Sequence, residues 1–150
     1  MEVAIVAAET LVPVDAAVAR RWFVELETHP ERYQFETHAG FTFTRGRFGE
    51  TGARFQTREQ FCGLPLTLSF ELTRVEDTCF RFRLARPPLP VWGAFTIEEA
   101  GDETTALCLA VGGTTRLGTW FLRFPPVRSA VRRQIRSEVE HIKASMSLWR

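Results

Sequence analysis

Apolar and polar residues alternate along most of the chain from residue 40 to residue 112, which is the pattern of half-buried strands. Turns rich in glycine, proline or acidic residues interrupt this alternation at 46–52, 63–65, 76–77, 87–90 and 101–102. Six consecutive antiparallel strands are therefore predicted. An earlier alternation of Val3, Ile5 and Ala7 stops at Pro13 and predicts a first strand over residues 2–12.

Helical spacing appears after the first strand and again at the end of the chain. Asp15 is a good N-cap for a helix that runs to about residue 26, and Thr28–Glu31 resembles a capping box that starts a second short helix. From the pair Pro125-Pro126 onward the pattern predicts one long helix. Its apolar face consists of Val127, Val131, Ile135, Val139, Ile142, Met146 and Trp149.

These elements predict one α+β domain over residues 1–150. A chain of 150 residues with 45% hydrophobic composition has the size of a single domain. The apolar face of the sheet needs a cover, and only the last helix is long enough to supply it. We therefore expect a curved seven-stranded antiparallel sheet that grips the C-terminal helix, with two short helices after the first strand.

Charge and composition argue against several functions. The 19 basic and 18 acidic residues give a net charge of +1 without a block of either sign, so neither nucleic acid nor an anionic membrane is expected as a partner. No uncharged apolar run reaches the roughly 18 residues of a membrane span. The start of the chain lacks the basic region of a signal peptide, so a cytoplasmic location is expected.

The cysteines and histidines do not have the spacing of metal ligands. Cys62, Cys79 and Cys108 are far apart in apolar contexts and are expected to be reduced core thiols. The histidines, including His38 just before the second predicted strand, match no metal motif. No metal or cofactor is therefore expected.

A few polar residues fall on faces that should point inward. Thr57 and Glu59 share strand parity with Phe55 and Phe61, and Gln134 and Glu138 lie at the edge of the helical stripe. A buried carboxyl without a partner has a raised pKa and can act as an acid or base near neutral pH. The plainer interpretation is that these residues lie in water at a strand end or helix flank, or pair with an arginine. Glu59, Glu138 and His38 are the catalytic candidates.

The remaining candidates for ligand contact are apolar. The same alternation is compatible with a filled core and with a hollow one. In the hollow case the residues facing the ligand would be Phe41, Phe43, Phe55, Leu68, Phe70, Phe82, Phe95, Val131, Ile135 and Ile142, together with Thr57, Glu59, Gln134 and Glu138.

The order of elements, with the pieces Val12–Val18 and Gly101–Thr105, resembles the START-like superfamily, also called SRPBCC or Bet v 1-like, including its polyketide cyclase/dehydrase branch. The resemblance implies a cavity between sheet and helix that holds a lipid, polyketide or isoprenoid. It leaves two alternatives open: a cyclase or dehydratase that uses cavity carboxylates or a histidine, and a chaperone-cofactor-like interaction protein.

Overall fold

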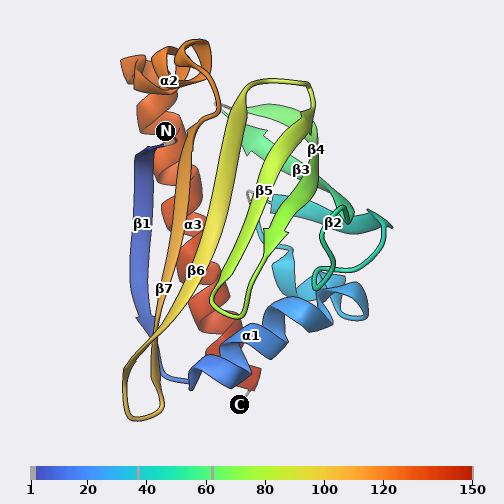
Figure 1. The fold of residues 1–150 in the computed structure, drawn as a ribbon, viewed down its shortest axis with the longest axis vertical. Coiled ribbons are helices and arrows are strands. Elements are labelled where there is room, and N and C mark those ends of the chain that lie inside the picture. Colours follow the sequence, from blue (N-terminus) through green and yellow to red (C-terminus); the bar gives the residue numbers. More distant parts are fainter. Residues whose placement is uncertain (1–2, 37, 62, 150) are drawn as a thin grey trace.

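The computed structural model describes residues 3–36, 38–61 and 63–149 (Figure 1). The strands are β1 (Ala4–Val12), β2 (His38–Arg45), β3 (Arg54–Phe61), β4 (Leu64–Val75), β5 (Cys79–Arg86), β6 (Val91–Gly101) and β7 (Thr104–Gly113). The helices are α1 (Ala16–Val24), α2 (Arg116–Arg123) and α3 (Pro125–Trp149), with the short 3-10 helices η1 (Glu25–Glu27) and η2 (Pro30–Tyr33).

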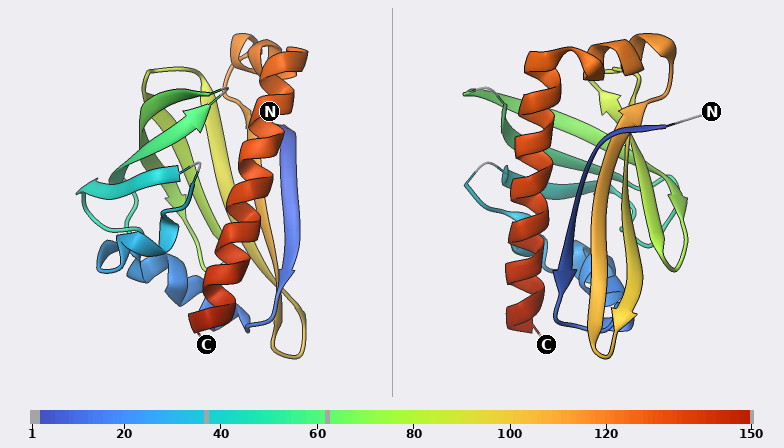
Figure 2. Two further views of the ribbon diagram at one scale, coloured as in Figure 1. Left: turned by 180° about the vertical axis from the view of Figure 1, so that it is seen from behind. Right: turned by 90° about the vertical axis from the view of Figure 1, so that its left-hand side faces the viewer.

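One antiparallel sheet contains all seven strands in the order β1-β7-β6-β5-β4-β3-β2. Strands β2 to β7 form a meander because each turns directly into the next, and β1 pairs with β7 at one edge. The sheet curves, and α3 runs along its inner side, where it packs against β1 and β7 (Figure 2). The predicted helix-grip architecture is confirmed.

The two short helices form as predicted, with shifted boundaries. The Asp15 side chain accepts a hydrogen bond from the Val18 N–H at 2.8 Å, so the predicted N-cap is confirmed. The α-helix ends at residue 24 and continues as η1. Thr28 does not cap the next helix as predicted, because its hydroxyl donates back to the Glu25 carbonyl and η2 starts only at Pro30.

The first strand presents a different face from the one its alternation suggests. Val3 is 56% exposed and Ala7 is exposed, whereas Val6 and Val12 lie in the core. The pairing of β1 with β7 shifts register between Ala4 and Val6. An irregularity of this kind exchanges the inward and outward positions of a strand, since side chains alternate with a period of two.

The C-terminal segment contains two helices where one was predicted. A separate helix, α2, precedes the Pro125-Pro126 pair, and α3 follows it. Gly118 of α2 packs closely against the connection between β5 and β6. A Cβ atom at this position would be only 2.0 Å from the Pro90 carbonyl oxygen. Only glycine lets the two backbones approach this closely.

The prediction that the cysteine thiols lie in the core is wrong for the two cysteines whose structure is described. Cys79 and Cys108 are half-buried and free, because they lie on the convex face while their neighbours Phe80 and Leu109 point into the core. Cys62 lies outside the described residues, as do the side chains of Phe61 and Trp149. None of the described helices combines the length and apolar character that crossing a membrane demands.

Candidate functional site

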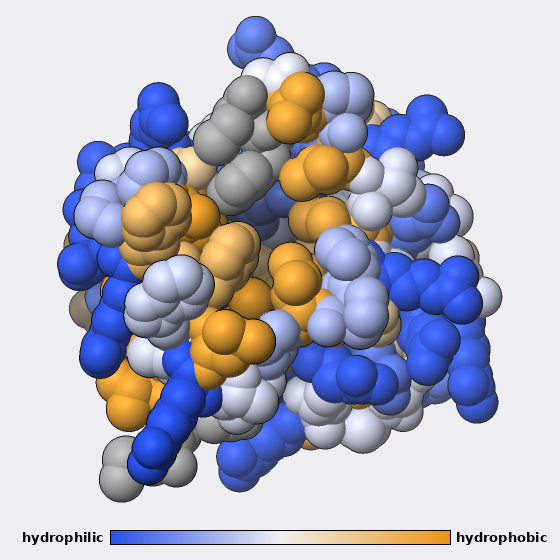
Figure 3. Space-filling model, turned by 90° about the horizontal axis from the view of Figure 1, so that it is seen from above, coloured by the Kyte–Doolittle hydropathy of each residue, from blue (hydrophilic) through white to orange (hydrophobic). Residues whose placement is uncertain are grey.

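A cavity of about 150 Å³ lies between the concave face of the sheet and α3. Figure 3 views the molecule from the end that carries α2 and shows a hollow with hydrophobic side chains along its border. The apolar lining consists of Phe41, Phe48, Phe55, Leu68, Phe70, Phe82, Leu84, Val91, Trp92, Gly93, Phe95, Leu109, Val111, Val131 and Ile135.

A cluster of hydrogen-bonded polar side chains forms one part of the wall. The Tyr33 hydroxyl donates to Glu138 Oε2 at 2.8 Å, and the Thr57 hydroxyl donates to Glu59 Oε2 at 2.6 Å. Between the two carboxyls lies the Gln134 amide, whose Nε2 is 3.2 Å from Glu59 Oε1 and 3.4 Å from Glu138 Oε1. The cluster therefore ties η2, β3 and α3 together at the cavity.

Local periodicity explains why these groups point inward. Thr57 and Glu59 are two residues apart on β3, on the same face as Phe55, and both are buried. Glu138 lies one helical turn beyond Gln134 on α3 and is 8% exposed, although the opposite face of that helix is charged. Strand and helix each contribute one carboxyl.

His38 begins β2 and is held beside the carboxyls. Its position pairs with Glu59 across the β2–β3 ladder, and its ring lies parallel to that of Phe35, with the planes at 8°. Its Nδ1 is 2.8 Å from the Tyr33 carbonyl oxygen. Because a carbonyl only accepts, Nδ1 carries the proton and Nε2 of the neutral ring keeps a lone pair.

Burial changes the protonation of the whole cluster. Desolvation, with the nearby charge of Glu138 second, raises the pKa of Glu59 to about 7. The pKa of Glu138 is also raised by burial, but hydrogen bonds from Tyr33, Gln134 and Glu59 oppose the rise. Of the two carboxyls, Glu59 therefore keeps its proton to the higher pH, and Glu138 is the one that ionises first. Burial lowers the pKa of His38, so its ring is neutral at neutral pH.

Among the residues that the structure describes, no cationic side chain neutralises the two carboxyls inside the cavity. Among the described residues that line it, none is a lysine or an arginine. Ionising both glutamates would therefore leave two uncompensated buried charges, which the shared proton avoids. The expected ion pair with arginine is wrong for this pair.

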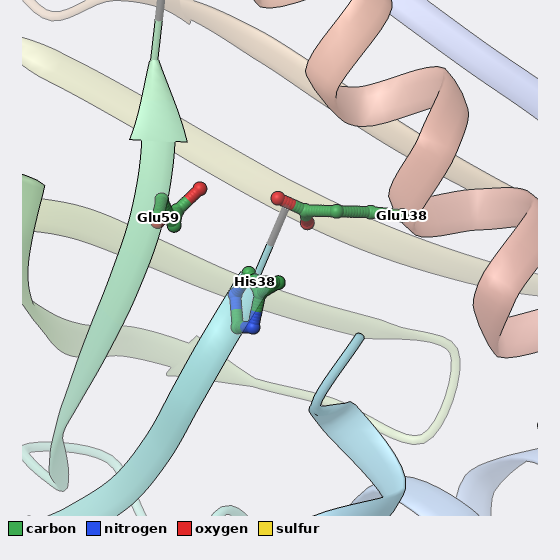
Figure 4. Close-up of side chains that lie close together, drawn as sticks. All are labelled: His38, Glu59 and Glu138. Carbon is green, nitrogen blue, oxygen red and sulfur yellow. The ribbon is translucent and has the colours of Figure 1, made fainter. Parts of the chain in front are cut away.

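The same side chains contain the donor atoms of a possible cation site. One ligand atom each from His38, Glu59 and Glu138 lies within 4.8 Å of the other two (Figure 4). An imidazole nitrogen with two carboxylates is a donor set that divalent transition metals accept. Sequence spacing does not reveal it, because the three residues come from β2, β3 and α3. A cation there would have to displace the proton on Glu59.

Most of the sequence-predicted ligand residues line the cavity. Phe43 and Ile142 do not. Phe43 is half-buried behind the lining, where its ring contacts Phe41, Phe48 and Phe55, and Ile142 is fully buried in the core cluster. The lining residues are Phe41, Phe55, Thr57, Glu59, Leu68, Phe70, Phe82, Phe95, Val131, Gln134, Ile135 and Glu138, with the catalytic candidate His38.

Two important lining residues escape the sequence argument. Tyr33 lies in a 3-10 helix and Phe48 in the turn between β2 and β3, so neither takes part in an amphipathic repeat. Both are buried, at 4% and 0% exposure. An isolated aromatic residue in a polar turn is the only signal that indicates such a position.

No protein-family model and no curated protein matches the chain, so the informative comparisons are with solved structures. The KanY protein superposes with a TM-score of 0.74 at 14% identity, covering 97% of this chain and 98% of its own. The ZhuI aromatase/cyclase from Streptomyces sp. R1128 gives 0.73 at 12%, covering 94% and 92%. The chain has the Bet v 1-like helix-grip fold. A third match, Ara h 8.0201, gives 0.69 at 14%, covering 93% and 95%.

These superpositions confirm the helix-grip fold that the resemblance implied. All of these identities lie far below the level at which a function is transferred, so the matches establish the arrangement of sheet and helix. What this chain does has to be inferred from its own cavity.

Proposed function

We propose that this protein binds an apolar small molecule that carries an oxygen-containing polar group, of the polyketide, isoprenoid or lipid class. The observation that carries the proposal is a largely apolar cavity with a hydrogen-bonded cluster of Tyr33, Thr57, Glu59, Gln134 and Glu138 on one wall. Such a combination of apolar walls and a few placed polar groups is typical of ligand sites. Two aromatase/cyclases among the structures with this fold lend support.

The volume sets the size of the first probe. A cavity of about 150 Å³ accepts a benzene-sized molecule. Larger ligands extend toward the mouth seen in Figure 3. The alternative of an interaction protein with an unused interior calls for a core filled with phenylalanine, so the cavity argues against it.

Binding of para-ethylphenol, followed by calorimetry or by NMR shifts, tests the proposal. We expect it to bind more tightly than ethylbenzene, because its hydroxyl reaches the polar cluster while both rings fill the same space. Val131→Phe adds volume to the lining and should weaken binding by about tenfold or more. Val127→Phe, one turn earlier on α3 and outside the lining, is the matched control. Equal binding by wild type and Val131→Phe would show that the probe does not bind in the cavity and would contradict the proposal.

A second candidate function, acid–base catalysis, is favoured by the unequal protonation of the two carboxyls. With a β-hydroxy ketone in the cavity, the Glu138 carboxylate takes the proton on the carbon next to the carbonyl, and the C–H electron pair forms the double bond. The C–O bond breaks as Glu59 gives its proton to the leaving hydroxyl, which departs as water. The pair then holds the same number of protons as before.

Dehydration of a β-hydroxy ketone with a phenyl group, followed by the ultraviolet absorbance of the conjugated product, tests this second function. Glu59→Gln should lower kcat/KM by about a hundredfold while para-ethylphenol still binds. Glu99→Gln changes an exposed carboxyl on β6 and should leave the rate unchanged. Undiminished turnover in Glu59→Gln, Glu138→Gln and His38→Asn would show that the cluster does no chemistry.

A further inference from the structure

The end of the molecule that carries α2 exposes an unusual amount of apolar surface. Leu117 and Trp120 are 67% exposed, Phe124 is 52% exposed and Phe121 is 37% exposed. Their spacing of i, i+3, i+4 and i+7 places them on one stripe of α2 and its C-cap. The buried residues of the same helix, Gly118 and Leu122, face the protein instead. The exposed stripe therefore contributes nothing to the core.

The stripe continues on neighbouring segments around the cavity mouth. Leu89 is 41% exposed and lies next to Pro90, against which Gly118 packs. Leu64 and Leu66 are 64% and 39% exposed at the start of β4, the strand that contributes Leu68 to the cavity. In Figure 3 hydrophobic side chains border the hollow. We call this surface the mouth face: Leu64, Leu66, Leu89, Leu117, Trp120, Phe121 and Phe124.

Positive charge accompanies this apolar surface. Residues 104–137 contain six arginines and no acidic residue, so this segment has a net charge of +6. Because the whole chain has a net charge of +1, the remaining residues together have a net charge of −5. The near-neutral total charge hides this uneven distribution of charge along the chain. Arg116, Arg123 and Arg128 are exposed, and within residues 3–36, 38–61 and 63–149 none of the ion pairs involves them.

A polar depression lies beside the apolar stripe. Two arginines and three threonines form its sides, with the Trp120 ring at the border. Guanidinium groups and hydroxyls are hydrogen-bond donors to phosphate oxygens, and arginine binds phosphate through paired N–H groups. Its lining is Gly113, Thr114, Thr115, Arg116, Thr119, Trp120 and Arg123.

We propose that the mouth face docks on an anionic phospholipid bilayer. Trp120, Phe121, Phe124 and Leu117 enter the interfacial region, and Arg116 and Arg123 bind lipid phosphates in the polar depression. Exposed aromatic residues next to arginines on an amphipathic helix are the composition of interfacial membrane segments. The cavity then opens toward the apolar phase in which a greasy ligand dissolves. The docking does not depend on which ligand the cavity holds.

Charge argues for a bilayer over a second copy of the chain. A two-fold contact through the mouth face would bring the same arginines of both copies together without an acidic partner. An anionic lipid surface attracts each arginine near it by about 1 kcal/mol.

Co-sedimentation with vesicles of phosphatidylcholine, with and without an equal amount of phosphatidylglycerol, tests the docking. We expect binding to the anionic vesicles that weakens as salt is added. Arg116→Gln with Arg123→Gln should lower the partition coefficient about thirtyfold. Trp120→Ser with Phe124→Ser should lower it at least tenfold. Brominated lipids should quench emission from wild type and not from Trp120→Phe.

Matched controls separate docking from general stickiness. Leu148→Ser removes an apolar side chain that is 89% exposed near the end of α3, and Arg45→Gln with Arg58→Gln removes two exposed charges from β2 and β3. All three substitutions should leave vesicle binding unchanged. No sedimentation of wild type with anionic vesicles at low salt would overturn the proposal. So would a wild-type dimer that Trp120→Ser with Phe124→Ser converts to monomer, because the mouth face would then belong to a second copy.

Discussion

At pH 8 the Glu59→Gln variant is expected to be more stable than wild type, with a free energy of unfolding about 3 kcal/mol higher. The pKa of Glu59 is about 7 in the folded protein against an ordinary value of 4.5. Folding therefore favours the protonated carboxyl. The stability that this preference contributes is fully present below pH 4.5 and is lost as the pH rises to about 7.

Glutamine keeps the shape of the protonated acid and never ionises. Its amide oxygen can accept from Thr57, and its nitrogen can donate to Glu138 in place of the carboxylic O–H and to the oxygen of a turned Gln134 amide. Urea unfolding of both proteins from pH 4 to pH 9 measures the difference. It should be near zero at the acidic end, grow through the interval from 4.5 to 7 and then level off. Glu99→Gln should show no such growth, and a pH-independent gain in Glu59→Gln would contradict the assignment of the proton.

The sequence predicts the fold well because its signals are local. Alternation with a period of two, separated by turns, identifies six strands from residue 40 to residue 112, and the stripe of Ile135, Ile142 and Met146 identifies the helix that covers them. The first strand shows the limit of this reasoning. Its pairing shift between Ala4 and Val6 comes from contact with β7, which no local pattern contains.

The site is predictable only in part, for the same reason. Strand parity and helical spacing place Glu59 and Glu138 inside, but nothing in either segment says that they meet. Their meeting depends on how α3 lies across the sheet, and the proton arrangement depends in addition on Tyr33 from η2. The mouth face is hidden for a related reason, since Leu64 and Trp120 are 56 residues apart in the sequence and belong to one surface only after folding.

The largest loss of stability is expected from a substitution in the closely packed part of the interior, away from the cavity. Phe23 of α1 is fully buried, and its ring centre lies 5.0 Å from that of Trp22, 5.3 Å from that of Phe80 and 4.9 Å from that of Phe95. It does not line the cavity. Phe23→Ala should therefore lower the free energy of unfolding by about 3–5 kcal/mol, through lost burial and a new void.

Phe70→Ala should cost less than half as much, which chemical denaturation of the two variants will measure. Phe70 packs on Phe55 and Phe82, but its side chain is half-buried and borders the existing cavity, so fewer contacts are lost when it is removed. Equal losses would mean that the interior is uniformly filled. Unequal losses would place the stability of the fold near α1 and leave the wall around Phe70 free to be shaped by a ligand.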